Sequence, residues 1–535
     1  MSAVRFLGGR PGREWRGTLH RKMFLHPRTL HTLSRTCAMR SRRRVLSLFL
    51  LTSCALLTAQ EQHSHGVQED LGEVSFPTTC DSSVQAEFNR SVALLHSFAY
   101  PEAEKAFRNV AKRDPGCAMA HWGVAMTHFH QLWQPRIAAA EFPTARDEIQ
   151  RGLAIGTNSQ RELKYIKAAE VLLQGDASTP YETRGPPYEQ AMKDLASGYP
   201  TDTEAQVFYA LALLSNAPPS DKTHSKQKQA VAILEPIFAK SPRHPGVAHY
   251  LIHAYDNAEM ASLGLPAARS YSKIAPSAPH ALHMPSHIFT RLGLWEDSIA
   301  SNIAARDAAH SAGDSGEELH AMDYLVYAYL QLGRDEEAAQ VVQKLKSIPR
   351  MNMNDFKVAY AATAMPIRCL VERQRWTEAA AVPVPGGLPA EVEAIVVWSN
   401  GLGSGKTGAV DKSAKSLQRL QQIEDRLRTS GSTYWATQVE AMRKEVAGWQ
   451  ARAEHHEDLA TQMMREAADL EDSVEKLPVT PGPIVPAREQ LGYLLLEQGH
   501  PELAMQEFQA ALKEAPGRRN AVQGAQRAAS EMSPK

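Results

Sequence analysis

The side chains best suited to chemistry in this sequence are histidines that recur between residues 244 and 331. His249 and His253 are four residues apart, and so are His283 and His287. A helix presents residues i and i+4 on one face, so each pair can offer two imidazoles to one ion. Neighbouring residues extend the set of candidate ligands to His280, His320 and Asp323. We therefore predict a divalent-metal site that these histidines share.

Imidazole nitrogen is a ligand for Zn, Cu, Fe and Ni, which are the candidate ions. Four further residues are expected to line the same groove and support the ligands: Asp256, Asn257, Arg291 and Tyr327. Zinc with an open coordination position could activate water, with His320 or Asp323 as base and Arg291 stabilising an oxyanion. Hydrolytic and redox chemistry both remain open, and the sequence identifies no catalytic residue. A pocket for an anionic ligand and a purely structural polar network are the other interpretations of the histidines.

The helices that carry these histidines belong to a pattern that repeats about every 34 residues. Its best copy starts at residue 485 and contains Leu491, Gly492, Gly499, Ala504, Phe508, Ala511 and Pro516. A second copy starts at residue 84 and contains Ala103, Phe107, Val110 and Pro115. A third starts at residue 319 and contains Leu325, Tyr329, Gly333 and Ala338. Small residues at fixed positions let paired helices approach closely, so the pattern predicts helix pairs.

This pattern resembles the tetratricopeptide repeat (TPR) family, and the resemblance covers most of the chain after residue 74. It implies an all-α fold, a superhelical solenoid of about nine to eleven antiparallel helix pairs. The chain is also similar to exported bacterial TPR proteins of unestablished function. The resemblance implies an alternative function, a scaffold that holds a peptide or protein segment in its concave groove without metal or catalysis. A small-molecule substrate in the groove is the further option that a metal site would favour.

The TPR resemblance also makes a prediction about register. In that family, positions 2, 5, 9, 12 and 13 of the first helix of each pair line the groove. Repeats starting at residues 245, 279 and 319 place on those positions His249, His253, His280, His283, His287, His320 and Asp323. The histidines of three successive helices should therefore converge. Pro285 lies inside the middle helix and is expected to kink it.

Composition divides the chain into segments. We expect a signal or targeting segment at 1–59, a linker at 60–74, and a first group of repeats with the histidine-lined groove at 75–381. A linker at 382–390 and a second group of repeats at 391–530 complete the chain. The proline-rich residues 478–483 are predicted to form a rigid connector between helices.

The N-terminal segment predicts export. Residues 45–57 are apolar, follow three arginines, and are too short to span a bilayer. Cleavage after Ala59 would release a soluble product, whereas residues 51–54 resemble a bacterial lipobox that would place a lipid anchor on Cys54. Met39 offers a second start of translation. Either product would lie outside the cytoplasm, in the periplasm or secreted, and no other run of the sequence predicts a transmembrane helix.

Cysteine usage agrees with that compartment. Cys80 and Cys117 each precede a predicted helix, one repeat apart, and are natural disulfide partners in an oxidising environment. Two free buried thiols are the alternative. Cys369 lies in an apolar helix and is expected to be part of the core.

Charge argues against nucleic acid as a partner. The first 44 residues hold 12 of the 59 basic residues and one of the 59 acidic residues, which leaves 47 bases against 58 acids. An acidic body without clustered Lys and Arg is a poor partner for phosphates. Residues 401–407 resemble a nucleotide-binding loop, but Asn400 replaces its first glycine. We expect a flexible turn there and no nucleotide cofactor.

Overall fold

The computed structural model describes residues 69–133, 136–348 and 351–533, which belong to one compact unit. The expected signal segment, the start at Met39 and the lipid-anchor residue Cys54 lie outside the described residues. Within the described ranges, helices and their connecting loops make up the fold, and no β-strand occurs. None of the described helices is long and apolar enough to cross a membrane.

The helices follow one another at short intervals along the chain. The first half contains η1 (Ser82–Val84), α1 (Gln85–His96), α2 (Tyr100–Arg113), α3 (Ala118–Thr127), α4 (Phe142–Ile155), α5 (Gln160–Leu172), α6 (Tyr181–Gly198), α7 (Thr203–Ser215), α8 (Ser225–Lys240), α9 (Pro245–Tyr255), η2 (Ala261–Gly264) and α10 (Leu265–Ile274). The centre contains α11 (Pro279–His283), α12 (Pro285–Arg291), α13 (Trp295–Ala312), α14 (Ser315–Gln331), α15 (Asp335–Lys344), η3 (Leu345–Ser347), α16 (Phe356–Glu372) and α17 (Trp376–Ala379). The last part contains α18 (Ala390–Lys406), α19 (Val410–Thr429), α20 (Thr433–Ala453), α21 (Glu457–Asp472), α22 (Ala487–Glu497), α23 (Pro501–Glu514) and α24 (Arg519–Met532).

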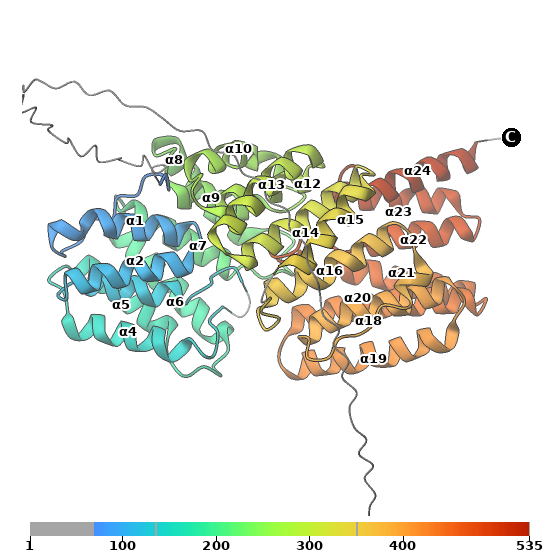
Figure 1. The fold of residues 1–535 in the computed structure, drawn as a ribbon, viewed down its shortest axis with the longest axis horizontal. Helices are drawn as coiled ribbons and strands as arrows, with labels where there is room; N and C mark the ends of the chain where they lie inside the picture. The colour runs from blue at the N-terminus through green and yellow to red at the C-terminus, as the bar shows by residue number, and fades with distance from the viewer. Residues whose placement is uncertain (1–68, 134–135, 349–350, 534–535) are drawn as a thin grey trace, which may run out of the picture. The chain divides into compact units, whose positions relative to one another are not determined.

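Successive helices pack as antiparallel pairs, beginning with α1 against α2 and ending with α22 against α23, and α24 covers the last pair (Figure 1). Each pair also packs on the next one, as α2 does on α3 and α21 on α22. Buried apolar side chains form three clusters along the helix pairs, at residues 71–289, 295–369 and 359–528. This arrangement confirms the predicted all-α, TPR-like solenoid of helix pairs.

Glycines at the repeat positions allow the close approach of the paired helices. A Cβ atom on Gly492 would lie 2.7 Å from the ring of Phe508, and one on Gly123 would lie 2.3 Å from the ring of Phe107. Both phenylalanines are fully buried. The small residue and the aromatic ring that the sequence pattern pairs therefore pack directly against each other.

The glycine-rich residues 401–407 differ from the expectation. Residues 401–406 are the last six residues of α18, and the turn begins only at Thr407. Gly403 packs on the backbone of Trp376, and Gly401 packs on Val446. Close packing on two sides offsets the conformational entropy that glycine loses in a helix, and this keeps the segment helical.

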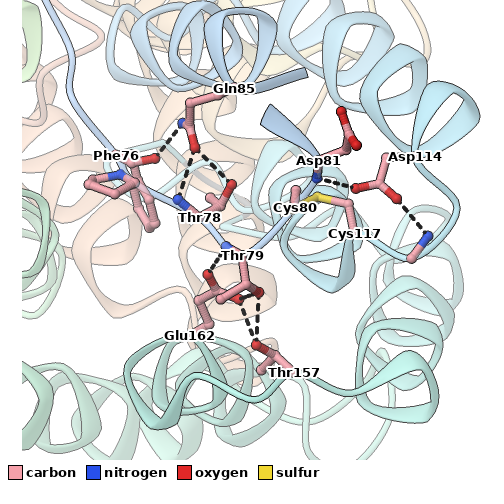
Figure 2. The surroundings of a disulfide bond; sticks show 12 residues. Phe76, Thr78, Thr79, Cys80, Asp81, Gln85, Asp114, Cys117, Thr157 and Glu162 are labelled. Carbon is pink, nitrogen blue, oxygen red and sulfur yellow. Dashed lines mark hydrogen bonds between the residues drawn. A yellow bond between two sulfur atoms is a disulfide. The ribbon is translucent and has the colours of Figure 1, made fainter. Parts of the chain in front are cut away.

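The Cys80–Cys117 disulfide joins the start of the described chain to the second helix pair (Figure 2). The chain on either side of Cys80 is held by the side chains of Glu162, on α5, and Asp114, at the end of α2. Thr79 donates its backbone N–H and its hydroxyl to Glu162, and the Asp81 N–H donates to Asp114 at 2.7 Å. The disulfide therefore closes a small network of polar contacts at the first repeats.

Candidate metal centre

Four helices bring six histidines together. His249 and His253 come from α9, His280 and His283 from α11, His287 from α12, and His320 from α14. Pro285 divides α11 from α12, but Met284 keeps helical dihedral angles, so both helices present their histidines on the same side. We call these residues the six-histidine centre. The six histidines converge as the register predicted. They are buried rather than open to a groove, and His253 is the most exposed of the six.

The six-histidine centre consists of two groups of three. The first triad is His249, His253 and His280, and the second triad is His283, His287 and His320. Within each triad, one nitrogen from every ring lies within 4.8 Å of the others. The four histidines of the predicted shared site are therefore divided between two triads. His280 completes the first triad, and His320 completes the second.

The two triads are neighbours. The ring centroids of His253 and His287 are 5.8 Å apart, and those of His280 and His283 are 6.0 Å apart. Both distances join one ring of the first triad to one ring of the second. The fold therefore packs the two groups side by side.

Hydrogen bonds fix which nitrogen of His283 and His287 carries the proton. His283 Nδ1 lies 2.6 Å from Asn302 Oδ1, an atom that can only accept because the amide nitrogen of Asn302 donates to Ser298 O. His287 Nδ1 lies 2.9 Å from the carboxylate of Asp256. Both rings must therefore donate from Nδ1, which leaves a lone pair on each Nε2. These two Nε2 atoms are 3.0 Å apart.

The first triad repeats the same arrangement. His249 Nδ1 donates to the carbonyl oxygen of His96 at 2.6 Å, and His280 Nδ1 donates to Glu317 at 3.1 Å. The Nε2 atoms of His249 and His280 therefore both carry lone pairs, and they lie 3.2 Å apart. His253 Nε2 is 3.0 Å from His249 Nε2. No hydrogen bond among the described residues fixes the tautomer of His253, whose Nε2–H can donate to His249. The contacts that join two acceptors are therefore His249 with His280 and His283 with His287.

A proton does not resolve this contact at neutral pH. Burial lowers the pKa of His249 and His283 well below the ordinary value, and the neighbouring histidines lower each pKa further. Burial also lowers the pKa of His287 to about 4, although the Asp256 carboxylate opposes the shift. The rings of His249, His283 and His287 are therefore neutral, with their lone pairs available to a cation.

The spacing of the nitrogens suits a metal ion. Zinc binds imidazole nitrogen at about 2.0–2.1 Å, so a tetrahedral ion places two such nitrogens roughly 3.3 Å apart. The observed contacts of 3.0 and 3.2 Å are close to that separation. The second ring nitrogen of each of these ligands is held by a carboxylate, amide or carbonyl oxygen, as is usual for histidines that bind metal.

Two members of the six-histidine centre have an unused nitrogen. His253 Nδ1 and His320 Nε2 are buried and have no hydrogen-bond partner among the described residues. The ring of His320 lies 4.2 Å from that of His283, centroid to centroid. A buried nitrogen without a partner is costly, and coordination of an ion by His320 Nε2 would satisfy it.

A third histidine cluster provides a contrast. His96 and His244 donate from Nε2 to the two oxygens of Glu204, at 2.8 and 2.9 Å. His96 Nδ1 contacts the Tyr250 hydroxyl at 2.9 Å, and His244 Nδ1 accepts from the backbone N–H of Val247. Every polar atom here has a complementary partner. This cluster is a satisfied structural network, which the six-histidine centre is not.

Comparison with known proteins adds the following. No family model and no curated protein matches the chain. Similar solved structures include the Cut9-Hcn1 hetero-tetramer of the APC/C, with 11% identity over 84% of this chain and 78% of that chain and a TM-score of 0.35. Yeast Tom70 has 12% identity over 83% and 88%, with a TM-score of 0.35. The human IFIT1 dimer has 12% identity over 78% and 90%, with a TM-score of 0.34.

The other predicted site residues have separate roles in the structure. Asp256 binds His287, and Arg291 donates to Asp256, so Arg291 is already paired and does not point an unused guanidinium at the histidines. Asn257 caps the turn after α9 through Ala254 and Met260. The Asp323 carboxylate faces Arg368, with Oδ1 and Nε 3.6 Å apart. The Tyr327 hydroxyl contacts Arg518.

The residues that orient the histidine ligands and cover them were not predicted from the sequence. Asn302 lies on α13, the second helix of its pair, where the register of the groove does not apply. Glu317 lies three residues before His320, and this helical spacing is the signal that could have found it. The rings of Phe98 and Trp133 cover the histidines, with Phe98 4.4 Å from His249 and Trp133 5.5 Å from His320, centroid to centroid.

The segment between α21 and α22, residues 473–486, also lies over the centre. Lys476 Nζ lies 2.6 Å from the Asp256 carboxylate that holds His287. The Tyr324 hydroxyl lies 3.4 Å from His287 Nε2 and donates to the carbonyl of Thr480. We call residues 473–486 the 473–486 connector. Its proline-rich part therefore packs against the candidate site, a position that the sequence alone did not indicate.

Proposed function

We propose that this chain is an exported TPR-like protein that binds divalent transition-metal ions at the six-histidine centre. One observation carries the proposal. The Nε2 lone pairs of His283 and His287 face each other at 3.0 Å, while Asn302 and Asp256 hold both Nδ1 protons. Two buried acceptors in contact cost free energy unless a cation lies between them.

The chemistry of the donors restricts the ion. All six ligands are imidazoles, with no carboxylate or thiolate in either triad. Mg and Ca prefer oxygen ligands, whereas Zn, Cu, Fe and Ni bind imidazole. We expect one ion in each triad, because the two triads are separate sets of three nitrogens that lie side by side.

Three protein nitrogens leave a coordination position for water or a substrate, as in catalytic rather than structural zinc sites. A bound ion would supply either Lewis acidity for hydrolysis or an electron-transfer step, depending on which metal it is. The Tyr324 hydroxyl lies 3.4 Å from His287 Nε2 and could donate to a molecule bound there in place of its hydrogen bond to the Thr480 carbonyl. We assign no catalytic residue.

Metal analysis of protein purified without a histidine tag tests the proposal. We expect two ions per chain after reconstitution with Zn, one of which is lost in His283→Asn and the other in His249→Asn. His310→Asn is the matched control, because the His310 side chain is 74% exposed and lies outside both triads. Circular dichroism establishes that each variant is folded. Folded wild-type protein that retains none of the four metals and whose melting temperature ignores them would contradict the proposal.

Export is part of the proposal because two features agree with it. The apolar segment at 45–57 predicts a signal, and the Cys80–Cys117 disulfide is of the kind that persists outside the cytoplasm. Fractionation of cells that express the full chain tests it. Recovery of the uncleaved chain in the cytoplasm with reduced cysteines would contradict export.

A second function, the binding of a peptide or protein segment, is favoured by a separate observation. The extended residues 69–79 pass over the helix ends and bind them through backbone groups, as in the hydrogen bond from Glu73 N–H to Arg243 O. They line an open groove of about 1,210 Å³ together with α1, α5 and α7. Selection of displayed peptides on the folded protein, repeated with Arg161→Ala in that groove, tests this function. Failure to select any peptide whose binding the substitution weakens would contradict it.

A further inference from the structure

A second cavity is lined in part by the 473–486 connector. Its volume is about 320 Å³, and α14, α16, α18, α20, α21 and the connector contribute to its walls. Five aromatic side chains line it: Tyr327, Tyr360, Trp398, Tyr434 and Trp435. This volume and apolar lining are typical of a site for a small organic molecule.

Two carboxyl groups reach this cavity from neighbouring helices. Glu445, on α20, is only 2% exposed, and its Oε2 accepts hydrogen bonds from Trp398 Nε1 and Gln490 Nε2. Glu471, on α21, accepts from the backbone N–H of Ala487 with Oε1. In the described part of the chain, the second oxygen of each carboxyl has no hydrogen bond and neither group has an ion pair.

The basic residues around the cavity are already paired with acids other than Glu445 and Glu471. Lys222 pairs with Glu475, and Lys476 pairs with Asp256. Arg291 binds both of these acids. Arg488 is held by three acids, Asp469, Asp472 and Glu507, of which Asp472 also lines the cavity. Among the described residues, Glu445 and Glu471 are therefore acids of the cavity wall that form no ion pair with a lining base.

The protonation of the two glutamates reflects this lack of a cation. Burial raises the pKa of Glu445 to about 8, against the hydrogen bonds from Trp398 and Gln490. Burial and the nearby Glu445 raise the pKa of Glu471 well above its ordinary value. A positively charged ligand would take the place of the protons that the two groups hold.

From this arrangement we infer that the cavity binds a small organic cation, an ammonium group on an apolar body. The aromatic faces attract a cation through their quadrupoles, and the paired carboxyls supply its counter-charge. The aromatic walls would also bury the apolar part of such a ligand. The inference does not depend on metal binding, because it rests on a different cavity and different residues.

Calorimetric titration with three ammonium probes tests the inference: tetramethylammonium, choline and benzyltrimethylammonium. The neutral isostere of choline, 3,3-dimethyl-1-butanol, separates attraction to charge from attraction to shape. We expect saturable binding of at least one ammonium probe, at least tenfold tighter than the neutral alcohol, with or without Zn present. No binding by any of the three probes, or equal binding of choline and the neutral alcohol, would overturn the inference.

Variants locate the site. Glu445→Gln and Glu471→Gln keep the shape of the side chain and remove its charge, and each is expected to weaken ammonium binding at least tenfold. Glu440→Gln and Glu466→Gln are matched controls on the same two helices, because Glu440 pairs with Arg428, Glu466 pairs with Lys444, and neither acid lines the cavity. A change of less than twofold in both cavity variants, or the same loss in the controls, would overturn the assignment.

Discussion

His283 and His287 hold their Nε2 atoms 3.0 Å apart while each donates its Nδ1 proton to an acceptor behind it. The contact between the two Nε2 atoms favours the binding of a cation between them, because His283 and His287 are both buried and the pKa of each is lowered. The cluster of His96, Glu204 and His244 is equally buried, yet all its donors meet acceptors. The direction of the hydrogen bonds, rather than the number of histidines, distinguishes a candidate metal site from a structural network.

The Asp256 carboxylate is expected to tune metal binding through His287. Asp256→Asn can no longer offer a charged acceptor to His287 Nδ1, and it leaves Lys476 and Arg291 without their shared partner. Loss of such a supporting contact typically costs 10- to 100-fold in metal affinity. Competition against a chelator measures the affinity. Asp297→Asn, at an exposed position on α13, is the control, and equal affinity of Asp256→Asn and wild type would show that Asp256 does not support a ligand.

Acid is expected to destabilise the metal-free protein before its carboxylates titrate. The pKa of His287 is about 4 in the folded protein and 6.5 in the unfolded chain, so the unfolded state binds more protons between these values. Stability is therefore full above pH 6.5 and falls as the pH drops toward 4, by roughly 3 kcal/mol for this residue alone. Denaturant unfolding at pH 7.5, 6 and 5 measures the trend. A free energy of unfolding that stays constant or rises on acidification would contradict the buried neutral rings.

The disulfide is expected to stabilise the first repeats without contributing to metal binding. Cys117→Ser opens a covalent loop with a sequence separation of 37 residues and should lower the free energy of unfolding by about 2–4 kcal/mol. Metal content should not change, because the bond lies outside both triads. Cys369→Ser, which changes the free buried cysteine, serves as the comparison for loss of a thiol alone. Unchanged stability of Cys117→Ser would mean that the bond does not form in the protein.

Close packing within the repeats predicts a strong response to one added methyl group. Gly492→Ala places a Cβ atom 2.7 Å from the buried Phe508 ring and should cost about 1–3 kcal/mol through overpacking. Gly386→Ala is the control, because no heavy atom would lie within 4 Å of its Cβ. Thermal unfolding of the two variants gives the comparison. Equal melting temperatures would contradict the tight contact between the paired helices.

The fold and the convergence of the histidines could be predicted from sequence because both follow from helical periodicity. Gly492 and Phe508 recur at repeat positions, and His249, His253, His283 and His287 share one face of their helices. The division into two triads could not be predicted, since it depends on how far His280 and His320 reach across between helices. Asn302 was missed for a related reason, because it belongs to a helix whose side chains the groove register does not describe.

Contacts between residues far apart in the sequence determine how the histidines are covered, and these contacts could not be predicted. The connector meets Asp256 through Lys476, 220 residues further along the chain, and no local pattern encodes that contact. The same packing covers the histidines that were expected to line an open groove. Residues 401–407 illustrate the opposite error, because local composition favours a turn there and tertiary contacts with Trp376 and Val446 keep it helical.

X-ray absorption at the metal edge of the reconstituted, untagged protein is the most direct measurement of metal binding by the six-histidine centre. We expect a first shell of imidazole nitrogens at about 2.0–2.1 Å for zinc, with the outer-shell scattering of histidine rings. The amount of bound metal per chain, read from the height of the edge, should fall by about half in His283→Asn and remain unchanged in His310→Asn, while the ion that remains keeps its imidazole shell. A first shell of oxygen alone or of sulfur, or a metal content that His283→Asn does not lower, would contradict the binding of metal by the six-histidine centre.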